Sequence, residues 1–147
     1  MAAPVRKQIR DAVAAALTGL TTSGTHVFEN RTIELQDTDL PGLRIYTSEE
    51  DVSTLSVGVA RRREHKLVLK VEACSKKSSG MDDELDAMVG EVLIAIDANQ
   101  GAGGARYIEP RRIEIEMQGE AEKEIGVASM SFEVLFYTAQ GAPDVSV

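Results

Sequence analysis

The chain has a single cysteine, Cys74, and only two histidines, His26 and His65. One cysteine allows no disulfide within the chain and no thiol cluster for a metal, which is typical of a protein of a reducing cytoplasm. Neither histidine has another metal-ligating residue at a typical spacing, so we interpret both as surface residues. We interpret Cys74 as a small apolar residue, because the sequence offers no base to activate it as a nucleophile. The sequence therefore predicts no catalytic residue, no cofactor and no metal site.

Long hydrophobic runs are also missing, since no apolar run reaches the roughly 18 residues of a membrane helix. The first residues lack the apolar stretch of a secretory signal, so we expect neither membrane insertion nor export. A hydrophobic content of 43% and a mean hydropathy of -0.14 are typical of globular proteins. The length of 147 residues predicts one domain over residues 1–147, with residues 139–147 as a loose tail.

Basic residues are scarce, with 16 Lys and Arg against 24 Asp and Glu and a net charge of -8. Such a surface repels a phosphate backbone, so DNA binding is not expected, although DNA could slide past it. The exception is the run Arg61, Arg62 and Arg63 at the foot of a predicted strand. We interpret this cluster either as a solvated strand edge or as a contact for an acidic partner.

Two further segments have more than one interpretation. The first is an acidic band, which either is a solvated face or faces a cation or a channel. It consists of Glu114, Glu116, Glu120, Glu122 and Glu124. With the three arginines, we take Glu120, Glu122 and Glu124 as candidates for a partner interface. The second is Gly101–Gly104, which follows a predicted helix and precedes a strand, the reverse of a phosphate-binding loop, so we interpret it as a flexible connection.

The apolar pattern predicts an α+β fold in which two helices pack on a largely antiparallel sheet. The predicted helices are Val5–Leu20 and Ser79–Asp97, the second with a capping box at Ser79 and Asp82. The predicted strands are residues 26–28, Leu43–Thr47, a hairpin arm over Val52–Ala60, the long strand Glu64–Ser75, and a hairpin over Tyr107–Tyr137 with a charged tip at Gly119–Gly126.

Alternation along the strands predicts which side chains form the core. In the long strand, Leu67, Leu69, Val71 and Ala73 share one face. In the closing hairpin, Ile113, Ile115 and Met117 alternate with glutamates, and Met130, Phe132, Val134 and Phe136 repeat the pattern on the return strand. In the second helix, Leu85, Met88, Val89, Val92, Leu93 and Ile96 form an apolar stripe.

From Lys7 to Tyr137 the chain resembles the tail terminator family of long-tailed bacteriophages, the group of the minor tail protein U of lambda-like phages. The resemblance rests on the order and spacing of several short motifs. They are Ile9–Val13 with Ala16-Leu17, Asp39-Leu40-Pro41 leading into Leu43–Tyr46, the strand Leu67–Glu72, the helix opening Asp83–Ala87, and the closing strand Ala128–Val134. The chain departs from the lambda-like pattern in Glu49–Arg63 and in Gly119–Gly126.

The resemblance implies a non-enzymatic structural protein of the virion, found in the host cytoplasm during assembly. It implies a hexameric ring on the head-proximal end of the tail tube, which stops tube polymerisation, docks the head connector or neck protein, and lets DNA pass through its lumen. Two alternatives stay open. One is another phage neck or tail-completion protein, and the other is a small cytoplasmic ligand-binding domain or enzyme that uses Glu114, Glu116 and His65.

Overall fold

A computed structural model describes residues 2–29, 32, 35–55, 61–76, 79–118 and 125–147 of the chain. The elements follow in the order α1 (Val5–Leu17), β1 (Val27–Phe28), η1 (Asp37–Asp39), β2 (Gly42–Thr54), β3 (Arg62–Ser75), α2 (Met81–Asp97), η2 (Ala102–Gly104), β4 (Tyr107–Gln118), β5 (Ile125–Ala139) and β6 (Ala142–Ser146). Among the described residues there are thus two α-helices and six strands. The predicted α+β fold with a largely antiparallel sheet is confirmed.

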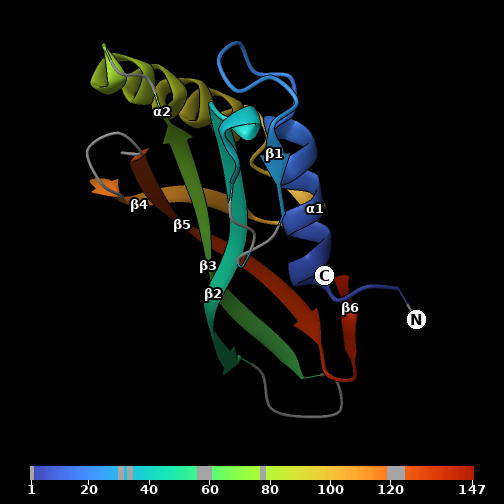
Figure 1. Cartoon of the computed structure of the whole chain (residues 1–147). Helices are drawn as coiled ribbons and strands as arrows, with labels where there is room; N and C mark the ends of the chain where they lie inside the picture. The colour runs from blue at the N-terminus through green and yellow to red at the C-terminus, as the bar shows by residue number, and fades with distance from the viewer. Residues whose placement is uncertain (1, 30–31, 33–34, 56–60, 77–78, 119–124) are drawn as a thin grey trace.

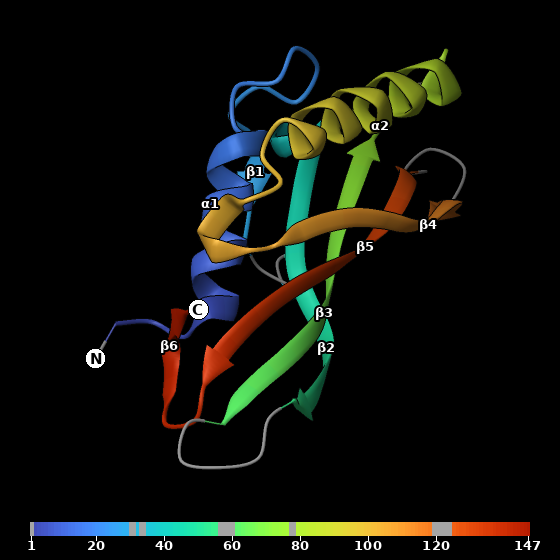
Figure 2. The same ribbon diagram turned by 180° about the vertical axis from the view of Figure 1, so that it is seen from behind.

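The sheet has the strand order β1-β2-β3-β5-β4, with β6 paired to β5 beside this path. β1 runs parallel to β2, and every other pair is antiparallel. Figure 1 shows the two helices against the twisted sheet, with α2 at one end of the long strands. Figure 2 shows β4 running out to the sheet edge below α2. The strand order therefore leaves β4 at one edge of the sheet.

The core lies between the helices and one face of the sheet. In β3 the side chains of Leu67, Leu69, Val71 and Ala73 are at most 1% exposed, as the alternation predicts. In β5 the core side chains are Ala128, Met130, Phe132, Val134 and Phe136, and the helices add Ile9, Val13, Leu85, Met88, Val92 and Ile96. The opposite face of β3 carries Lys66 and Lys70, and neither described helix packs on that face.

Helix α1 ends three residues earlier than predicted, at Leu17 instead of Leu20. Thr18 has an extended backbone, with φ of -81° and ψ of 131°, which stops the helix. Gly19 follows with φ of 91°, a left-handed backbone that glycine adopts without strain. Residues that share the buried face recur every fourth position, from Val5 through Ile9 and Val13 to Leu17.

The segment Gly101–Gly104 is packed against α1, and the prediction of a flexible connection is wrong. It contains η2, and Gly103 has φ of 64°. A Cβ atom at Gly103 would lie 2.5 Å from the Cα of Ile9 and 2.6 Å from the carbonyl oxygen of Gln8. The glycine is thus needed for close approach of two backbones as well as for its φ angle. The sequence pattern of small residues did not reveal this contact.

Strand β2 is one strand where the sequence predicted two. It pairs along β3 from Gly42↔Cys74 to Thr54↔Arg63, with a shift of register between Thr47 and Glu49. A bulge of this kind adds one residue and inverts the alternation beyond it, which hides the continuity of the strand in the sequence. Residues 56–60 of the predicted hairpin arm lie outside the described residues.

Helix α2 begins at Met81, and the predicted capping box is not present. Gly80 is the N-cap residue, with a left-handed backbone (φ 73°) and no side-chain capping hydrogen bond. Asp82, Asp83 and Glu84 nonetheless place negative charge at the positive end of the helix dipole. The first turn packs on β5, where a Cβ at Gly126 would lie 2.4 Å from the Met81 sulfur.

The end of the chain also differs from the predicted loose tail. Residues Ala142–Ser146 form β6, which pairs with β5. The side chain of Gln8 in α1 donates a hydrogen bond to the carbonyl of Asp144 at 2.8 Å. The hydroxyl of Ser146 donates to the carbonyl of Gly104 at 2.8 Å. These contacts fix the last strand against both α1 and η2.

Candidate assembly surfaces

The arginine cluster lies where β3 begins. Arg62 and Arg63 belong to β3 itself, so the structure extends the predicted strand by two residues. The guanidinium carbon of Arg62 lies 4.3 Å from the ring centre of Tyr137, and that of Arg106 lies 5.6 Å away from the same ring. Arg61 and Arg62 are exposed, and Arg63 is half-buried. Two cations therefore share one aromatic ring at this end of the sheet.

The acidic candidates are only partly described. Glu120, Glu122 and Glu124 lie outside the described residues. Glu114 and Glu116 lie on β4, where Glu114 forms an ion pair with Arg112. The strand pairing places Glu116 beside Val127, far from the start of β3.

An exposed apolar surface on β4 is the feature that the sequence did not reveal. Ile113, Ile115 and Met117 are 44%, 51% and 50% exposed, and we call them the β4 stripe. Register with β5 places Ile113 beside Met130, which is fully buried. The β4 stripe thus lies on the helix-side face of the sheet, but α2 covers β5 and leaves this part of the edge strand open. Alternation alone predicts the face of a residue, and it does not predict how far a helix reaches across the sheet.

A shallow groove joins the β4 stripe to the start of α2. Its lining residues are Gly80, Met81, Asp82, Asp83 and Met117. The apolar floor is therefore bordered by the carboxylates of the first turn of α2. The acidic helix start in the sequence is the one signal that could have pointed to this groove.

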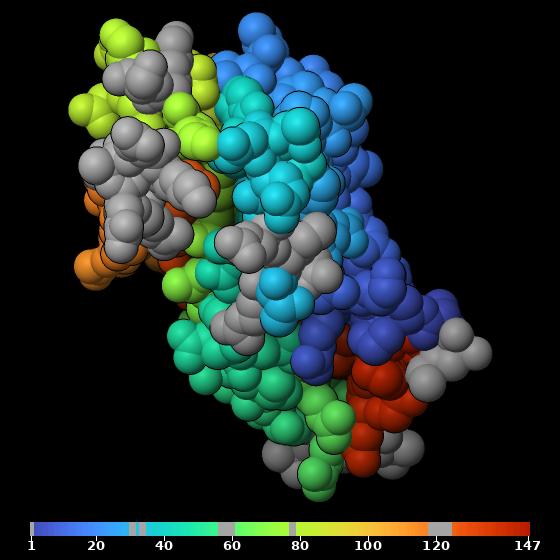
Figure 3. Space-filling view, in the orientation of Figure 1, coloured from blue at the N-terminus to red at the C-terminus, as the bar shows by residue number. Residues whose placement is uncertain are grey.

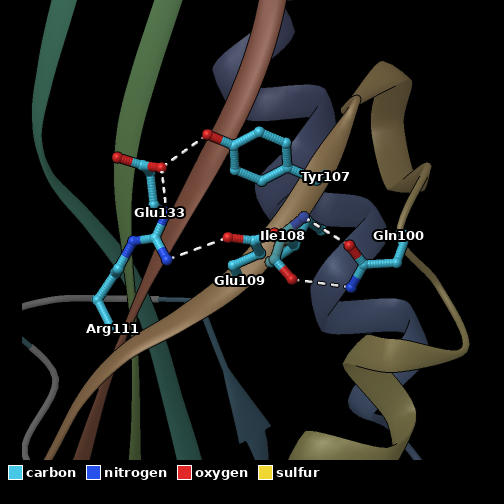
Figure 4. Close-up of polar contacts among 6 residues, drawn as sticks. All are labelled: Gln100, Tyr107, Ile108, Glu109, Arg111 and Glu133. Carbon is cyan, nitrogen blue, oxygen red and sulfur yellow. Dashed lines mark hydrogen bonds and ion pairs between the residues drawn. The ribbon is translucent and has the colours of Figure 1, made fainter.

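A polar network ties β4 to β5 on the open face of the sheet (Figure 4). The Tyr107 hydroxyl donates to Glu133 Oε2 at 2.7 Å, and Arg111 donates to the same oxygen at 2.6 Å. Arg111 also forms an ion pair with Glu109 at 3.0 Å. The hydrogen bond to the Glu133 carboxylate raises the pKa of Tyr107 to about 12. The hydrogen bonds from Tyr107 and then Arg111 lower the pKa of Glu133.

The start of β4 has a second polar contact, on its outer edge. The Gln100 side chain donates to the carbonyl of Ile108 at 2.8 Å and accepts from the Ile108 N–H at 2.9 Å (Figure 4). Both backbone groups of one strand residue are therefore satisfied by one amide side chain. Gln100 lies three residues beyond the end of α2 at Asp97, so this contact also ties the segment after the helix to the strand.

His65 is not the surface residue that the sequence predicted. Its Nδ1 lies 2.9 Å from Glu50 Oε2, its Nε2 lies 2.7 Å from Thr138 Oγ1, and its ring stacks on Phe136 at 4.4 Å. The side chain is 12% exposed. This order of carboxylate, imidazole and hydroxyl resembles a catalytic triad, but Thr138 is only 3% exposed. The cluster holds three strands together and does not offer the hydroxyl to a substrate.

The residues of the predicted enzyme alternative do not share a site. His65 pairs with Phe136 of β5, whereas Glu116 pairs with Val127. These β5 partners lie roughly 30 Å apart along the strand at about 3.3 Å per residue. Glu114 lies on β4 near Glu116, so a cleft that joins them to His65 is not formed.

Neither the cysteine nor the other histidine forms a reactive centre. Cys74 is buried, and this burial raises the pKa of its thiol to about 11, which agrees with a small apolar role. His26 is half-buried, and its Nδ1 lies 3.2 Å from the carbonyl oxygen of Pro41. Within the described residues, no three His, Cys, Asp or Glu side chains are grouped to hold a metal ion. Among the same residues, no helix is long and apolar enough to span a membrane.

The fold and these surfaces define a small α+β protein with an arginine cluster at one end of its sheet and an exposed apolar stripe at the other. The chain belongs to the phage minor tail protein U family, whose sequence pattern matches residues 4–136. The predicted resemblance is thereby confirmed, and the protein is a structural component of a phage tail. A solved chain from the virion of a native gene transfer agent particle is similar at 20% identity, with a TM-score of 0.49 and 92% of each chain covered. A comparison with curated proteins found no match.

Proposed function

We propose that the protein is a tail terminator. It forms a ring of about six subunits on the head-proximal end of the tail tube, stops tube polymerisation, and provides the docking surface for the head connector. The observation that carries this proposal is the match to the phage minor tail protein U family over residues 4–136. A ring stops polymerisation when one face fits the tube and the other face accepts no further tube subunit.

The charge of the chain supports a ring through which DNA moves. With a net charge of -8, the protein repels the phosphate backbone instead of releasing its counterions. The lumen then lets DNA pass without specific binding. The function rests on contacts with other copies, with the tube protein and with the connector, and it includes no reaction step.

The test is tube growth from purified tail tube protein with and without this chain. Negative-stain images should show shorter tubes that carry a ring at one end when the chain is present. Unchanged tube lengths, together with binding to the portal or adaptor, would contradict the terminator function and identify a neck protein instead. Tube protein incubated with an unrelated acidic protein of similar size is the control for non-specific effects.

The arginine cluster gives a sharper version of this test. Replacing Arg61, Arg62 and Arg63 by serine should weaken capping, because these cations face an acidic surface of the tube or of a neighbouring subunit. The side chain of Arg112 is 72% exposed and lies outside the cluster, so Arg112→Ser is the control and should leave capping unchanged. Equal capping by the triple variant and the wild type at physiological salt would refute the role of the cluster.

A further inference from the structure

The β4 stripe is an apolar surface on an edge strand. Its three side chains lie on one face, at alternate positions, and each is about half exposed. Scattered apolar residues on a surface need no explanation, but a contiguous row on an edge strand is typical of an interaction site. The groove beside it is bordered by the carboxylates of Asp82 and Asp83. A partner for this surface therefore combines apolar and basic side chains.

The chain itself carries such a surface at the other end of the sheet. Where β2 stops and β3 begins, Val52 and Leu55 are 51% and 53% exposed. The N–H of Leu55 donates to the carbonyl of Arg62 at 2.8 Å, which brings the leucine beside the arginine run. Arg61 and Arg62 are exposed at the same place. We call Val52, Leu55, Arg61 and Arg62 the β2–β3 end.

These two surfaces cannot meet within one molecule. Ser75 pairs with Gly126, which pairs with Met117, so the β4 stripe lies where β3 ends. The β2–β3 end lies where β3 begins, and the 14 residues of β3 span roughly 45 Å at about 3.3 Å per residue. Figure 1 shows the same separation, with the C-terminal end of β4 and the start of α2 far from the start of β3, and Figure 3 shows the β2 and β3 atoms extending to the opposite end of the molecule.

We propose that the β2–β3 end of one copy docks in the groove between β4 and α2 of the next copy. The contact places apolar Leu55 against the β4 stripe and Arg61 against the carboxylates of Asp82 and Asp83. Such a contact joins two different surfaces, so it is heterologous and closes a ring when its rotation fits. The proposal rests on the proposed function in that the ring is the terminator ring, and it assigns the subunit contact.

A symmetric pairing of two β4 strands fits the charges less well. An antiparallel pair centred on Ile115 would match the apolar side chains of both stripes. The same register would place Glu114 opposite Glu116 twice, and like charges directly opposite each other destabilise a sheet. In the proposed contact, by contrast, the arginines of the β2–β3 end face the carboxylates of Asp82 and Asp83, which have the opposite charge.

The test uses two variants that each remove one of the two surfaces. The first, Leu55→Asp with Arg61→Glu, alters the β2–β3 end and keeps the groove. The second, Ile115→Lys with Asp83→Lys, alters the groove and keeps the β2–β3 end. Sedimentation velocity should show that the wild type associates. In each variant the association constant should fall about tenfold or more, as it does when a central contact residue is replaced. A mixture of the two variants should form a dimer that does not grow, because one intact contact remains.

The control variant is Ile94→Lys, which changes an isoleucine of α2 that is 73% exposed and outside both surfaces. It should associate as the wild type does. Thermal unfolding of all variants separates loss of contact from loss of fold. A wild type that stays monomeric at its solubility limit, variants that associate normally, or a mixture without dimers would each overturn the proposed contact.

Tube capping distinguishes failure of this contact from failure of the proposed function. If both variants cap tubes as well as the wild type, the contact is wrong and the terminator function stands. If the wild type itself does not cap tubes, the terminator function fails whatever its association shows.

Discussion

Replacing Gly103 by alanine tests whether η2 is fixed against α1. The added Cβ would lie 2.5 Å from the Cα of Ile9, 2.6 Å from its backbone nitrogen and 2.6 Å from the carbonyl oxygen of Gln8. All three atoms are helix backbone, so none of them can rotate away as a side chain does. Gly103 also has φ of 64°, which an alanine adopts with strain.

The expected cost is the sum of two terms. A non-glycine residue in the left-handed region costs roughly 1–2 kcal/mol. Overpacking against a rigid neighbour costs roughly 1–3 kcal/mol, for a total of about 2–5 kcal/mol. This is a large part of a typical unfolding free energy of about 5–15 kcal/mol. At about 2–4 °C per kcal/mol for a chain of this size, the melting temperature should fall by roughly 4–20 °C.

The assay is urea and thermal unfolding followed by circular dichroism, with Gly141→Ala as the matched control. Gly141 has φ of 81°, and a Cβ there would meet nothing within 4 Å, so its substitution carries the backbone strain alone. The difference between the two variants measures the packing of η2 on α1. If Gly103→Ala costs no more than Gly141→Ala, the close contact between η2 and α1 is refuted.

Three other changes have defined outcomes. Gly126→Ala should cost less than Gly103→Ala, because the nearest atom, the Met81 sulfur, belongs to a flexible side chain; an equal loss of unfolding free energy would contradict this. Glu133→Gln should lower the pKa of Tyr107 from about 12, measured by phenolate absorbance. Because the pKa of Tyr107 is higher in the folded protein than in the unfolded chain, its hydrogen bond stabilises the fold fully below pH of about 10, and this contribution is lost as pH rises through about 12. An unchanged Tyr107 titration in the variant would refute the hydrogen bond. Cys74 should resist alkylation at pH 8 until the protein unfolds, because its pKa is about 11, and rapid labelling of the folded protein would contradict its burial.

The controls for these experiments are internal to the chain. For the tyrosine titration, the wild-type protein is the reference, and the titration step of Tyr107 should move to lower pH in the variant. For the thiol, labelling in denaturant gives the rate of an accessible cysteine, and the ratio of rates measures protection.

The core could be predicted because alternation and helical spacing report which face of an element is buried. In β3 every second residue from Leu67 to Ala73 is in the core, as the pattern requires. The pattern failed at β2, since the bulge after Thr47 inverts the alternation that the strand otherwise keeps. Periodicity is therefore reliable within a regular stretch and loses information at each irregularity.

The contact surfaces were harder to predict because they depend on tertiary placement. The arginine run was recognisable from its charge, yet its stacking on Tyr137 joins residues 75 positions apart in the sequence. His65 has an ordinary sequence environment, and only the strand pairing brings Glu50 and Thr138 to its ring. The β4 stripe has the alternation of a buried strand, but it is exposed because α2 packs over β5 and does not extend over this part of β4.

The contact between Gln100 and Ile108 has a consequence for growth of the sheet. An edge strand with free backbone groups is a template for any extended chain, including the chains of an aggregate. The Gln100 side-chain amide hydrogen-bonds both the N–H and the carbonyl of Ile108, so neither group is available to a further strand. Strand addition from solution is blocked at the start of β4, which confines any partner to the far half of the strand. A single side chain thus limits extension of the sheet at this end of β4.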